Sequence, residues 1–459
     1  MVRPRGHGGH IRRGDDLLGP GPAVLAGPSP DTHQMVRRSP QVKAHIGMIT
    51  QWYDPERGAA AIPGIISRSL TRRGHEVDVV TGFPNYPSGE IHPGYALRLY
   101  QRETIGGVNV HRAPLYPSHD SHPVRRAANF LSFAGAASAV AWSRLATADA
   151  LLVHSSPATA AIPALTVKAL RRKPFVVHIQ DLWPQTVLSS GFLNESGGLT
   201  VERILQRFCD SVYRHADTIA VTAPGMVDLV AGRGVDPRKI AFVPNWADEA
   251  AFRPTPPDPD LALALGIVWP FTVMYAGNFG EFQALDVLVD AATLLRDRSD
   301  IGFALVGGGV GEARLRSMVT ERRLNNVTFV PPQPFDKMAA ILALGDVQLV
   351  SLQDQPLFRA TLPSKLQGVL AAGRPVIGAL SGDAADVVCA SGAGPVVTPG
   401  SAADLAGAIR TACGSSPDML RARGQAGRAY YVSRFSEQVV GDKLSGLLQE
   451  AADRKGTRR

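Results

Sequence analysis

Cysteine is scarce in this chain, which has three in 459 residues, scattered at positions 209, 389 and 413. So few cysteines at such spacings encode neither a disulfide framework nor a zinc site. A secretory signal is not expected in the first forty residues, because Gly and Pro interrupt the apolar stretch from Leu17 to Val24. A fold that depends on several disulfide bonds and a cysteine-based zinc-binding domain are therefore excluded.

Several motifs that would indicate other functions are also missing. The formal charge is +8, yet no aromatic-interleaved basic stripe or recognition helix favours nucleic acid. No G-x-G-x-x-G follows the first strand, so a dinucleotide coenzyme is not indicated. No Asp-x-Asp stands at a strand end to hold a metal. The positive charge leaves anionic membranes and phosphorylated small molecules as partners.

The length predicts two or three domains, and the composition is that of an ordinary α/β protein. Residues 1–41 are rich in Gly, Pro, Arg and His without an apolar period, which predicts a disordered N-terminal extension. Met35 is an alternative start under the hypothesis that the preceding residues come from an over-long gene model.

Two α/β halves follow one another along the chain. Strands at 45–50 and 76–81 flank a helix, which makes a βαβ unit and a parallel pair. A Pro-rich run at 253–259 marks a linker. The same order restarts with a strand at 271–275 and a helix at 285–296, so two doubly wound units with a cleft between them are expected. Further strands are predicted at 97–104, 108–112, 150–154, 174–179, 217–222, 301–306, 327–330 and 347–352.

Residues 123–145 begin Pro-Val-Arg-Arg and continue as an Ala-, Phe-, Leu- and Trp-rich stretch. The stretch is too short and too rich in small residues to indicate a transmembrane helix. Two interpretations stay open: a basic, apolar helix that lies on the membrane, and a buried crossover helix.

The polar loop at 351–365 follows an apolar strand and leads into a short helix that stops at Gly373. Such a loop lies at the carboxyl ends of the strands, where open α/β sheets bind ligands. Arg359 and Lys365 place two cations near a helix N-terminus, whose free N–H groups attract anions. A phosphate-bearing substrate is therefore expected.

Other strand ends also carry polar or glycine residues. His178 and Asp181 lie at the carboxyl edge of the strand at 174–179, where His178 is either a site residue or a hydrogen-bonded core residue. Gly308 lies in a run of three glycines. Without side chains, this backbone can either approach a ligand closely or form a tight turn. Asp383 begins a predicted helix, where its carboxylate either caps the helix or contacts a ligand.

A set of motifs occurs in the order known from one enzyme family. The motifs are Tyr53-Asp54-Pro55-Glu56 with Gly58 to Ala61, Gly82-Phe83-Pro84-Asn85-Tyr86-Pro87, His178-Ile179-Gln180-Asp181-Leu182-Trp183-Pro184, Val243-Pro244-Asn245, Tyr275-Ala276-Gly277-Asn278, Gly307-Gly308-Gly309, and Pro363-Ser364-Lys365 with Ala371-Ala372-Gly373-Arg374-Pro375-Val376. With these motifs, from about residue 43 to 445, the chain resembles a retaining GT-B glycosyltransferase of the large family four group. The resemblance is to the branch that builds bacterial capsular, exopolysaccharide and O-antigen chains.

The resemblance implies an α/β protein of GT-B fold, with two doubly wound Rossmann-like domains facing across a cleft. The implied organisation is an extension at 1–41, an acceptor-binding domain at 42–250, a linker at 251–265, a nucleotide-sugar-binding domain at 266–430, and a C-terminal helix crossing back with a basic tail at 431–459.

The resemblance also implies roles for individual residues. His178, Asp181 and Lys365 form the expected catalytic set: His178 contacts the donor sugar with Asp181 as its companion, and Lys365 neutralises the diphosphate. The expected donor-binding set is Gly58, Ala59, Gly277, Asn278, Gly308, Arg359, Ser364 and Asp383. Retaining transfer needs stabilisation of a departing diphosphate more than a protein nucleophile, so neither a metal nor a cofactor beyond the donor substrate is expected.

The chain departs from the family pattern in two places. Two glutamates eight residues apart are usual before the Gly-x-Pro-Val strand, and here those positions hold Ala360 and Gly368. The usual Arg and Lys after the glycine turn are also missing, since Glu281 and Gln283 stand there. The first change leaves ribose recognition without its usual carboxylate, and Arg359 and Lys365 are the residues that could compensate for the second.

The expected partners are a nucleotide sugar donor and a lipid-linked or saccharide acceptor at the cytoplasmic membrane face, with residues 123–145 touching the anionic surface. Two alternatives remain. A nucleotide-sugar epimerase of the same architecture would turn over the donor without an acceptor. A non-catalytic sugar-nucleotide-binding assembly subunit would account for the missing glutamates.

Overall fold

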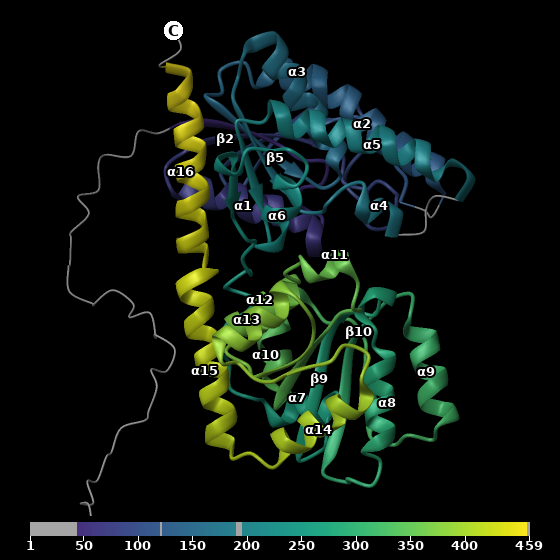
Figure 1. The fold of residues 1–459 in the computed structure, drawn as a ribbon. Helices are drawn as coiled ribbons and strands as arrows, with labels where there is room; N and C mark the ends of the chain where they lie inside the picture. The colour runs from purple at the N-terminus through teal and green to yellow at the C-terminus, as the bar shows by residue number, and fades with distance from the viewer. Residues whose placement is uncertain (1–43, 120–121, 190–194, 457–459) are drawn as a thin grey trace, which may run out of the picture. The chain divides into compact units, whose positions relative to one another are not determined.

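The computed structural model describes residues 44–119, 122–189 and 195–456. The predicted N-terminal extension and the candidate start at Met35 lie outside these residues. Two largely parallel sheets, each flanked by helices, organise the described chain (Figure 1). This arrangement confirms the predicted α/β class.

The first sheet has the strand order β3-β4-β2-β1-β5-β6-β7-β8. All neighbouring strands are parallel except the β3–β4 pair. Successive connections run outward in opposite directions from β1 and β5, so a topological switch point, where α/β sheets bind ligands, lies between these two strands. The strands are β1 His45–Ile49, β2 Glu76–Gly82, β3 Gln101–Ile105, β4 Val108–Ala113, β5 Ala150–Ser155, β6 Phe175–Ile179, β7 Thr218–Val221 and β8 Ile240–Phe242.

The second sheet has the order β11-β10-β9-β12-β13-β14 and is parallel throughout. Its switch point lies between β9 and β12, which is the strand that leads into the predicted anion-binding loop. The strands are β9 Phe271–Asn278, β10 Ile301–Gly308, β11 Val327–Val330, β12 Val347–Ser351, β13 Val376–Ala379 and β14 Val396–Val397.

Helices cover both faces of each sheet, as the right-handed crossovers of parallel strands require. Those before residue 250 are α1 Ile62–Arg72, α2 Pro123–Arg144, α3 Ala161–Arg171, α4 Gln185–Ser189, α5 Glu195–His215 and α6 Gly225–Ala231. Those after it are α7 Pro259–Ala264, α8 Asp286–Leu294, α9 Glu312–Glu321, α10 Met338–Ala343, α11 Pro356–Arg359, α12 Ser364–Ala371, α13 Asp383–Ser391, α14 Ala402–Cys413, α15 Pro417–Arg434 and α16 Glu437–Gly456. Short 3₁₀ turns are η1 Gly58–Ala61, η2 Ala158–Ala160, η3 Pro237–Lys239, η4 Glu281–Gln283 and η5 Phe335–Lys337.

The last helix completes the core of the first sheet. Helix α16 packs against β5, β6 and α1 (Figure 1). Its Val440, Leu444 and Leu448 are buried in the same apolar cluster as Ile46 and Val79. Residues of α16 and of the first two strands, more than about 360 positions apart in sequence, therefore share one core.

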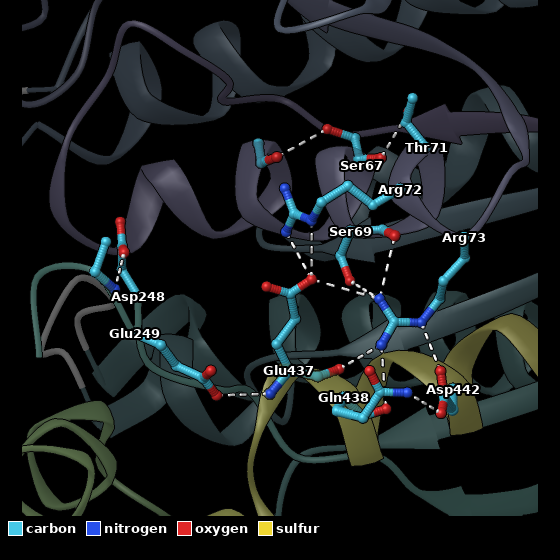
Figure 2. Close-up of polar contacts among 12 residues, drawn as sticks. Ser67, Ser69, Thr71, Arg72, Arg73, Asp248, Glu249, Glu437, Gln438 and Asp442 are labelled. Carbon is cyan, nitrogen blue, oxygen red and sulfur yellow. Dashed lines mark hydrogen bonds and ion pairs between the residues drawn. The ribbon is translucent and has the colours of Figure 1, made fainter. Parts of the chain in front are cut away.

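Figure 2 shows how the beginning of α16 is fastened to the end of α1. The guanidinium of Arg73 donates to the carbonyls of Glu437 and Gln438 at 2.8 and 3.1 Å and to Asp442 Oδ1 at 2.8 Å. Arg72 donates to Glu437 Oε1 at 2.6 Å. Glu249, in the segment between the two sheets, accepts from the backbone N–H of Glu437 at 2.9 Å.

Helix α2 confirms the predicted helix at 123–145 and packs against α3, β2 and β4. One face, including Phe133 and Ala137, is buried, whereas Val124, Leu131 and Trp142 are exposed. None of the described helices is long and apolar enough to span a bilayer. The buried face fits a crossover helix, and membrane contact by the exposed face stays a prediction.

Some element boundaries differ from the sequence-based expectations. The strand predicted at 97–104 begins only at Gln101, because Leu97 and Leu99 are exposed and outside the sheet. The predicted linker at 251–265 contains α7, whose first turn is capped by Asp258. The predicted final helix is two helices, α15 and α16, with a break at Phe435 and Ser436.

Candidate functional site

Glycine turns form the carboxyl ends of β9 and β10. Gly277, Gly307 and Gly309 have φ of +145°, +139° and +150°, conformations that side-chain-bearing residues rarely adopt. A Cβ on Gly307 would lie 2.0 Å from the carbonyl oxygen of Gly277. Gly308 pairs in register with Asn278, whose carbonyl accepts from Tyr275 at 2.7 Å. The two turns present bare backbone at one sheet edge.

Lys365, the second residue of α12, is pressed onto this glycine turn. Its Nζ lies 3.0 Å from the centre of the Tyr275 ring, and a Cβ on Gly277 would lie 2.9 Å from the same atom. The Nζ is buried and has no hydrogen-bond partner among the described residues. Burial lowers the pKa of Lys365 well below its ordinary value. An amine in this state lacks a counter-anion, and a bound phosphate would supply one.

The other predicted residues around this loop are arranged differently. Ser364 begins α12 beside Lys365. The guanidinium of Arg359 forms a two-pronged pair with Asp354, with Nε to Oδ1 at 2.8 Å and Nη2 to Oδ2 at 2.9 Å. Asp383 Oδ2 accepts from the backbone N–H of Gly225 at 2.6 Å. The structure thus brings Lys365 to the glycine turn of Gly277, while Arg359 and Asp383 already have partners.

A pocket of about 200 Å³ lies at the carboxyl edge of the first sheet, around its switch point. Thr50 follows β1, Ala60 and Pro63 come from η1 and α1, and His154 is in β5. Burial lowers the pKa of His154 well below its ordinary value, so its ring is neutral near pH 7. Its Nδ1 has no hydrogen-bond partner among the described residues. The predicted Gly58 and Ala59 begin η1 immediately before Ala60, and Gly58 has φ +68°.

His178 lies behind this pocket. It is fully buried, and its Nε2 is 2.9 Å from the carbonyl of Val243. Because that nitrogen must donate to a carbonyl, the proton of the neutral ring is on Nε2. Burial lowers the pKa of His178 to about 4, against the opposing effect of the Val243 hydrogen bond. The rings of His178 and His154 are 6.1 Å apart in an edge-to-face arrangement, so His154 forms part of the pocket wall and His178 supports it.

Sequence reasoning missed His154. The signal was present, since Val153-His154-Ser155-Ser156 ends an apolar strand in the same way as the motif of His178. The register pairs His154 directly with His178. Only the strand order, which sets β5 beside β1, shows which histidine borders the switch point.

A second, mostly apolar pocket of about 320 Å³ adjoins the first and shares Trp52, Arg126 and Ser156 with it. Asp181 contributes a carboxylate to its wall, and Oδ2 accepts from Ser156 Oγ at 3.1 Å. Burial raises the pKa of Asp181. The apolar wall includes Phe130, Leu131, Trp183, Val187, Val201 and Leu205. This pocket offers one proton acceptor in apolar surroundings.

Hydrogen bonds join the helix of Lys365 to the segment of Asp181. Gln367, two residues after Lys365, donates to the carbonyl of Asn245 at 2.8 Å. The Asn245 side chain donates to Gln180 Oε1 at 2.6 Å. The side chain of Gln367, the backbone and side chain of Asn245, and the side chain of Gln180 therefore connect α12 with the segment that carries Asp181.

The two positions without the family's glutamates are tightly packed. Ala360 is buried, with its Cβ 3.0 Å from a Cβ built on Gly225. A Cβ on Gly368 would lie 2.9 Å from the ring of Phe252. A side chain at position 368 would therefore overlap with Phe252, and a larger one at 360 would have to fit into a buried position. Within the described residues, moreover, no three His, Cys, Asp or Glu side chains are grouped so that they could hold a metal ion.

Two family models match the chain. The model described as a glycosyl transferase 4-like domain matches residues 57–246, and the model described as glycosyl transferases group 1 matches residues 270–414. The first range spans β2 to β8 of the first sheet, and the second spans all strands of the second sheet. The matched ranges include His154 and Asp181 of the first-sheet pockets and the glycine turns of the second sheet.

Relatives of known sequence carry glycosyltransferase names. The putative colanic acid biosynthesis glycosyl transferase WcaI of Escherichia coli is 32% identical over 327 residues, which are 70% of this chain and 79% of the relative. The probable glycosyltransferase WbjE of Pseudomonas aeruginosa is 23% identical over 311 residues, 67% of this chain and 76% of the relative.

Solved structures share the fold at low sequence identity. Sucrose-phosphate synthase from Thermosynechococcus elongatus has a TM-score of 0.68 at 18% identity, covering 89% of this chain and 99% of that one. Anabaena HepE in complex with UDP-glucose has a TM-score of 0.64 at 17% identity, covering 89% of this chain and 100% of that one. These similarities confirm the two-domain α/β architecture.

Proposed function

Because the chain belongs to the GT-B glycosyltransferase family, as its two domain matches and its similarity to WcaI show, we propose that it transfers a sugar, with retention of anomeric configuration, from a nucleotide diphosphate sugar. The proposed acceptor is a lipid-linked or oligosaccharide chain in cell-surface polysaccharide biosynthesis. The observation that carries this proposal is the buried Nζ of Lys365, which lies against the Gly277 turn and the Tyr275 ring with no hydrogen-bond partner or carboxylate recorded among the described residues.

The second sheet supplies the groups for a leaving diphosphate. Bare backbone at Gly277, Gly307 and Gly309 allows close approach of phosphate oxygens. The N–H groups at the first turn of α12, beginning at Ser364, add partial positive charge. Lys365 completes the site with a full charge that becomes favourable as negative charge develops on the departing phosphate. The Anabaena relative with a bound UDP-sugar supports a donor of this class.

The first sheet supplies the groups for the sugar. His154 contributes a neutral ring to the wall of the pocket in which the sugar would lie. The sequence-based role of His178 in contacting the donor sugar becomes a positioning role, because the ring is fully buried against His154 and Val243. Gly58 and Ala59 begin the turn that faces the incoming donor.

The apolar pocket is the proposed acceptor site. Its wall of Phe130, Leu131, Trp183 and Leu205 suits a lipid-linked acceptor or the apolar face of a sugar ring. Asp181 would accept a hydrogen bond from the acceptor hydroxyl and orient it toward the donor. The exposed apolar side chains of α2, whose first turn borders this pocket, support contact with an anionic membrane surface.

The proposed nucleoside site lacks the family's usual carboxylates, because Ala360 and Gly368 occupy their positions. The proposed domains remain those of the sequence analysis, with 42–250 for the acceptor and 266–430 for the donor. Helix α16 belongs structurally with the acceptor domain.

Transfer of radiolabel from a panel of nucleotide sugars to membrane extract tests the function. Wild-type protein should label a lipid-extractable or oligosaccharide product. Lys365→Ala should reduce the rate by about 100-fold or more, because it removes charge stabilisation of the leaving group. Lys337→Ala is the matched control, since Lys337 lies in η5 and is not among the recorded neighbours of Gly277, Gly307 or Gly309, and should leave the rate unchanged.

Three outcomes would refute the proposal. Wild-type protein inert toward every donor, with no nucleotide released, would remove the enzymatic function. Donor conversion without any acceptor would indicate an epimerase. Normal polymer synthesis in cells that carry only Lys365→Ala would indicate a non-catalytic assembly subunit.

A further inference from the structure

A large basic hollow lies at the amino edge of the first sheet, opposite the edge that carries His154 and Asp181. Pro174, Asp217 and Lys239 precede β6, β7 and β8 and form its floor. The hollow has a volume of about 920 Å³, within the range of small-molecule sites. Six cationic side chains surround it: Lys168, Arg171, Arg172, Arg214, Lys239 and Arg454. We call it the basic pocket.

The positive charge of the basic pocket is poorly compensated by its own residues. Asp217 is the carboxylate among the lining residues, and Lys168 Nζ holds it at 2.6 Å. Arg171 donates to the carbonyl of Trp142, and Arg454 has only a 3.9 Å contact with an exposed glutamate. Arg172 and Arg214 have no side-chain hydrogen bond or ion pair recorded in the part of the chain that is described. Several cations therefore face one hollow without anionic partners.

Helix ends account for part of this charge. Helices α3, α5 and α16 all end at the basic pocket, and a cation in the last turn of a helix is stabilised by the helix dipole. This effect explains a cation at each helix end. It does not explain why three helix ends are held apart around an unfilled hollow, where like charges repel one another.

We propose that the basic pocket binds a phosphate-bearing anion through Arg172, Arg214 and Arg454. Guanidinium groups present paired N–H donors that match two phosphate oxygens. The ligand would join α16, which carries Arg454, to α3 and α5, and so would hold the end of the last helix on the first sheet. The site is separate from the donor site, since it lies at the opposite edge of the strands.

Two sources could supply this phosphate chemistry. The volume of the hollow suits a soluble phosphate compound. The exposed side chains of Leu170 and Trp142 beside the pocket suit the headgroup region of an anionic membrane. The two sources share the same contacts and are separated by experiment.

The test compares wild type with the double variant Arg172→Gln/Arg214→Gln. Both residues are exposed, so the variant should keep the wild-type circular dichroism spectrum. The matched control is Arg323→Gln, because Arg323 is also an exposed helix-end arginine with positive φ, 52° against 54° for Arg172. All three proteins are made on the Lys365→Met background, which weakens phosphate binding at the donor site equally in all three, so a difference among them reports on the basic pocket.

One arm uses tripolyphosphate at constant ionic strength and reads the Tm. The other uses co-sedimentation with phosphatidylcholine vesicles, with and without phosphatidylglycerol. We expect at least one arm to show binding by the parent and by Arg323→Gln, weakened about tenfold or more in the double variant. A rise of Tm alone assigns a soluble ligand, and sedimentation alone assigns a headgroup. Equal responses of all three proteins in both arms, or no response in either, would overturn the proposal.

Discussion

The carboxylate of Asp383 accepts a hydrogen bond of 2.6 Å from the backbone N–H of Gly225. Asp383 begins α13 beside the second sheet, and Gly225 begins α6 beside the first. An acid from one half of the chain therefore caps a helix of the other. A Cβ on Gly225 would lie 3.0 Å from the same carboxylate oxygen, so this contact requires the close approach that glycine allows.

Asp383→Ala should lower the free energy of unfolding by about 1 kcal/mol, the usual cost of losing a helix cap. Asp383→Asn keeps an acceptor oxygen and should lose less. Urea unfolding of the three proteins measures both differences. Identical unfolding of Asp383→Ala and wild type would mean that the contact has no energetic importance.

Lys365 should make the free protein more stable at higher pH. Its pKa is lowered in the folded state, so the unfolded chain binds more protons, and the free energy of unfolding rises with pH between the lowered pKa and the ordinary value of 10.5. Lys365→Met should raise the Tm and flatten this rise, because a buried amine without a partner is replaced by an apolar group of similar length. Calorimetry from pH 6 to 9 gives the measurement. A lower Tm for Lys365→Met would contradict the buried, unpartnered state of the amine.

The same lysine predicts proton uptake on donor binding, because an adjacent diphosphate restores a higher pKa. Titration calorimetry in buffers of different ionisation enthalpy should show uptake near pH 8. The uptake should vanish in Lys365→Met, although weak binding of the nucleotide would persist through the backbone of the glycine turns.

His45 should produce the opposite pH dependence. The hydrogen bond to Asp78, with Nε2 to Oδ2 at 2.9 Å, raises the pKa of His45 above 6.5 in the folded state. The stabilisation is therefore complete below 6.5 and is lost as pH rises through the folded pKa. His45→Gln should cost about 1–2 kcal/mol at pH 6 and less at pH 9. A cost that is independent of pH would show that the charged form is not involved.

Arg72 and Arg73, at the end of α1, both contact the beginning of α16 and can be compared directly (Figure 2). The side chain of Arg73 is 10% exposed and makes the contacts to Glu437, Gln438 and Asp442, whereas that of Arg72 is 56% exposed. Arg73→Ala should cost about 2–3 kcal/mol, and Arg72→Ala less than about 1 kcal/mol, as for solvent-exposed ion pairs. Hydrogen exchange of the α16 amides should speed up in the first variant only. Equal costs would show that burial does not strengthen the contact.

Gly368 and Gly407 test the packing at the position of a missing glutamate. Helix propensity favours Gly→Ala by about 1 kcal/mol at both sites. At Gly407 nothing lies within 4 Å of the new Cβ, so Gly407→Ala should gain that amount. At Gly368 the Cβ meets the Phe252 ring at 2.9 Å, and overpacking of about 1–3 kcal/mol should make Gly368→Ala destabilising. Chemical denaturation of both variants decides the comparison.

The elements and the glycine turns could be predicted because their signals are local. Continuous apolar strands such as Phe175–Ile179 and glycines after β9 and β10 can be recognised without knowledge of distant contacts. The loop between β12 and the helix of Lys365 could be located for the same reason, and its binding of an anion stays a prediction. The strand predicted at 97–104 was partly wrong because exposure of Leu97 and Leu99 depends on what lies outside the sheet.

Residue roles that depend on strand order or on side-chain pairing could not be predicted. His154 and His178 end neighbouring strands in register, and the position of β5 beside β1 decides which of them borders the pocket. The sequence predicts Arg359 as a cation available to a ligand, but it does not show that Arg359 forms an ion pair with Asp354, five residues earlier. Such facts depend on the folded chain as a whole.

The burial of Val440, Leu444 and Leu448 among strands from the beginning of the described chain has a consequence for synthesis in the cell. While the ribosome is still producing the second sheet, the first sheet has one apolar face without its cover. The apolar residues that α16 covers stay exposed until α16 itself has been translated. The nascent chain therefore carries exposed apolar surface during the whole synthesis of the second sheet, and a premature stop after α15 would leave it exposed permanently.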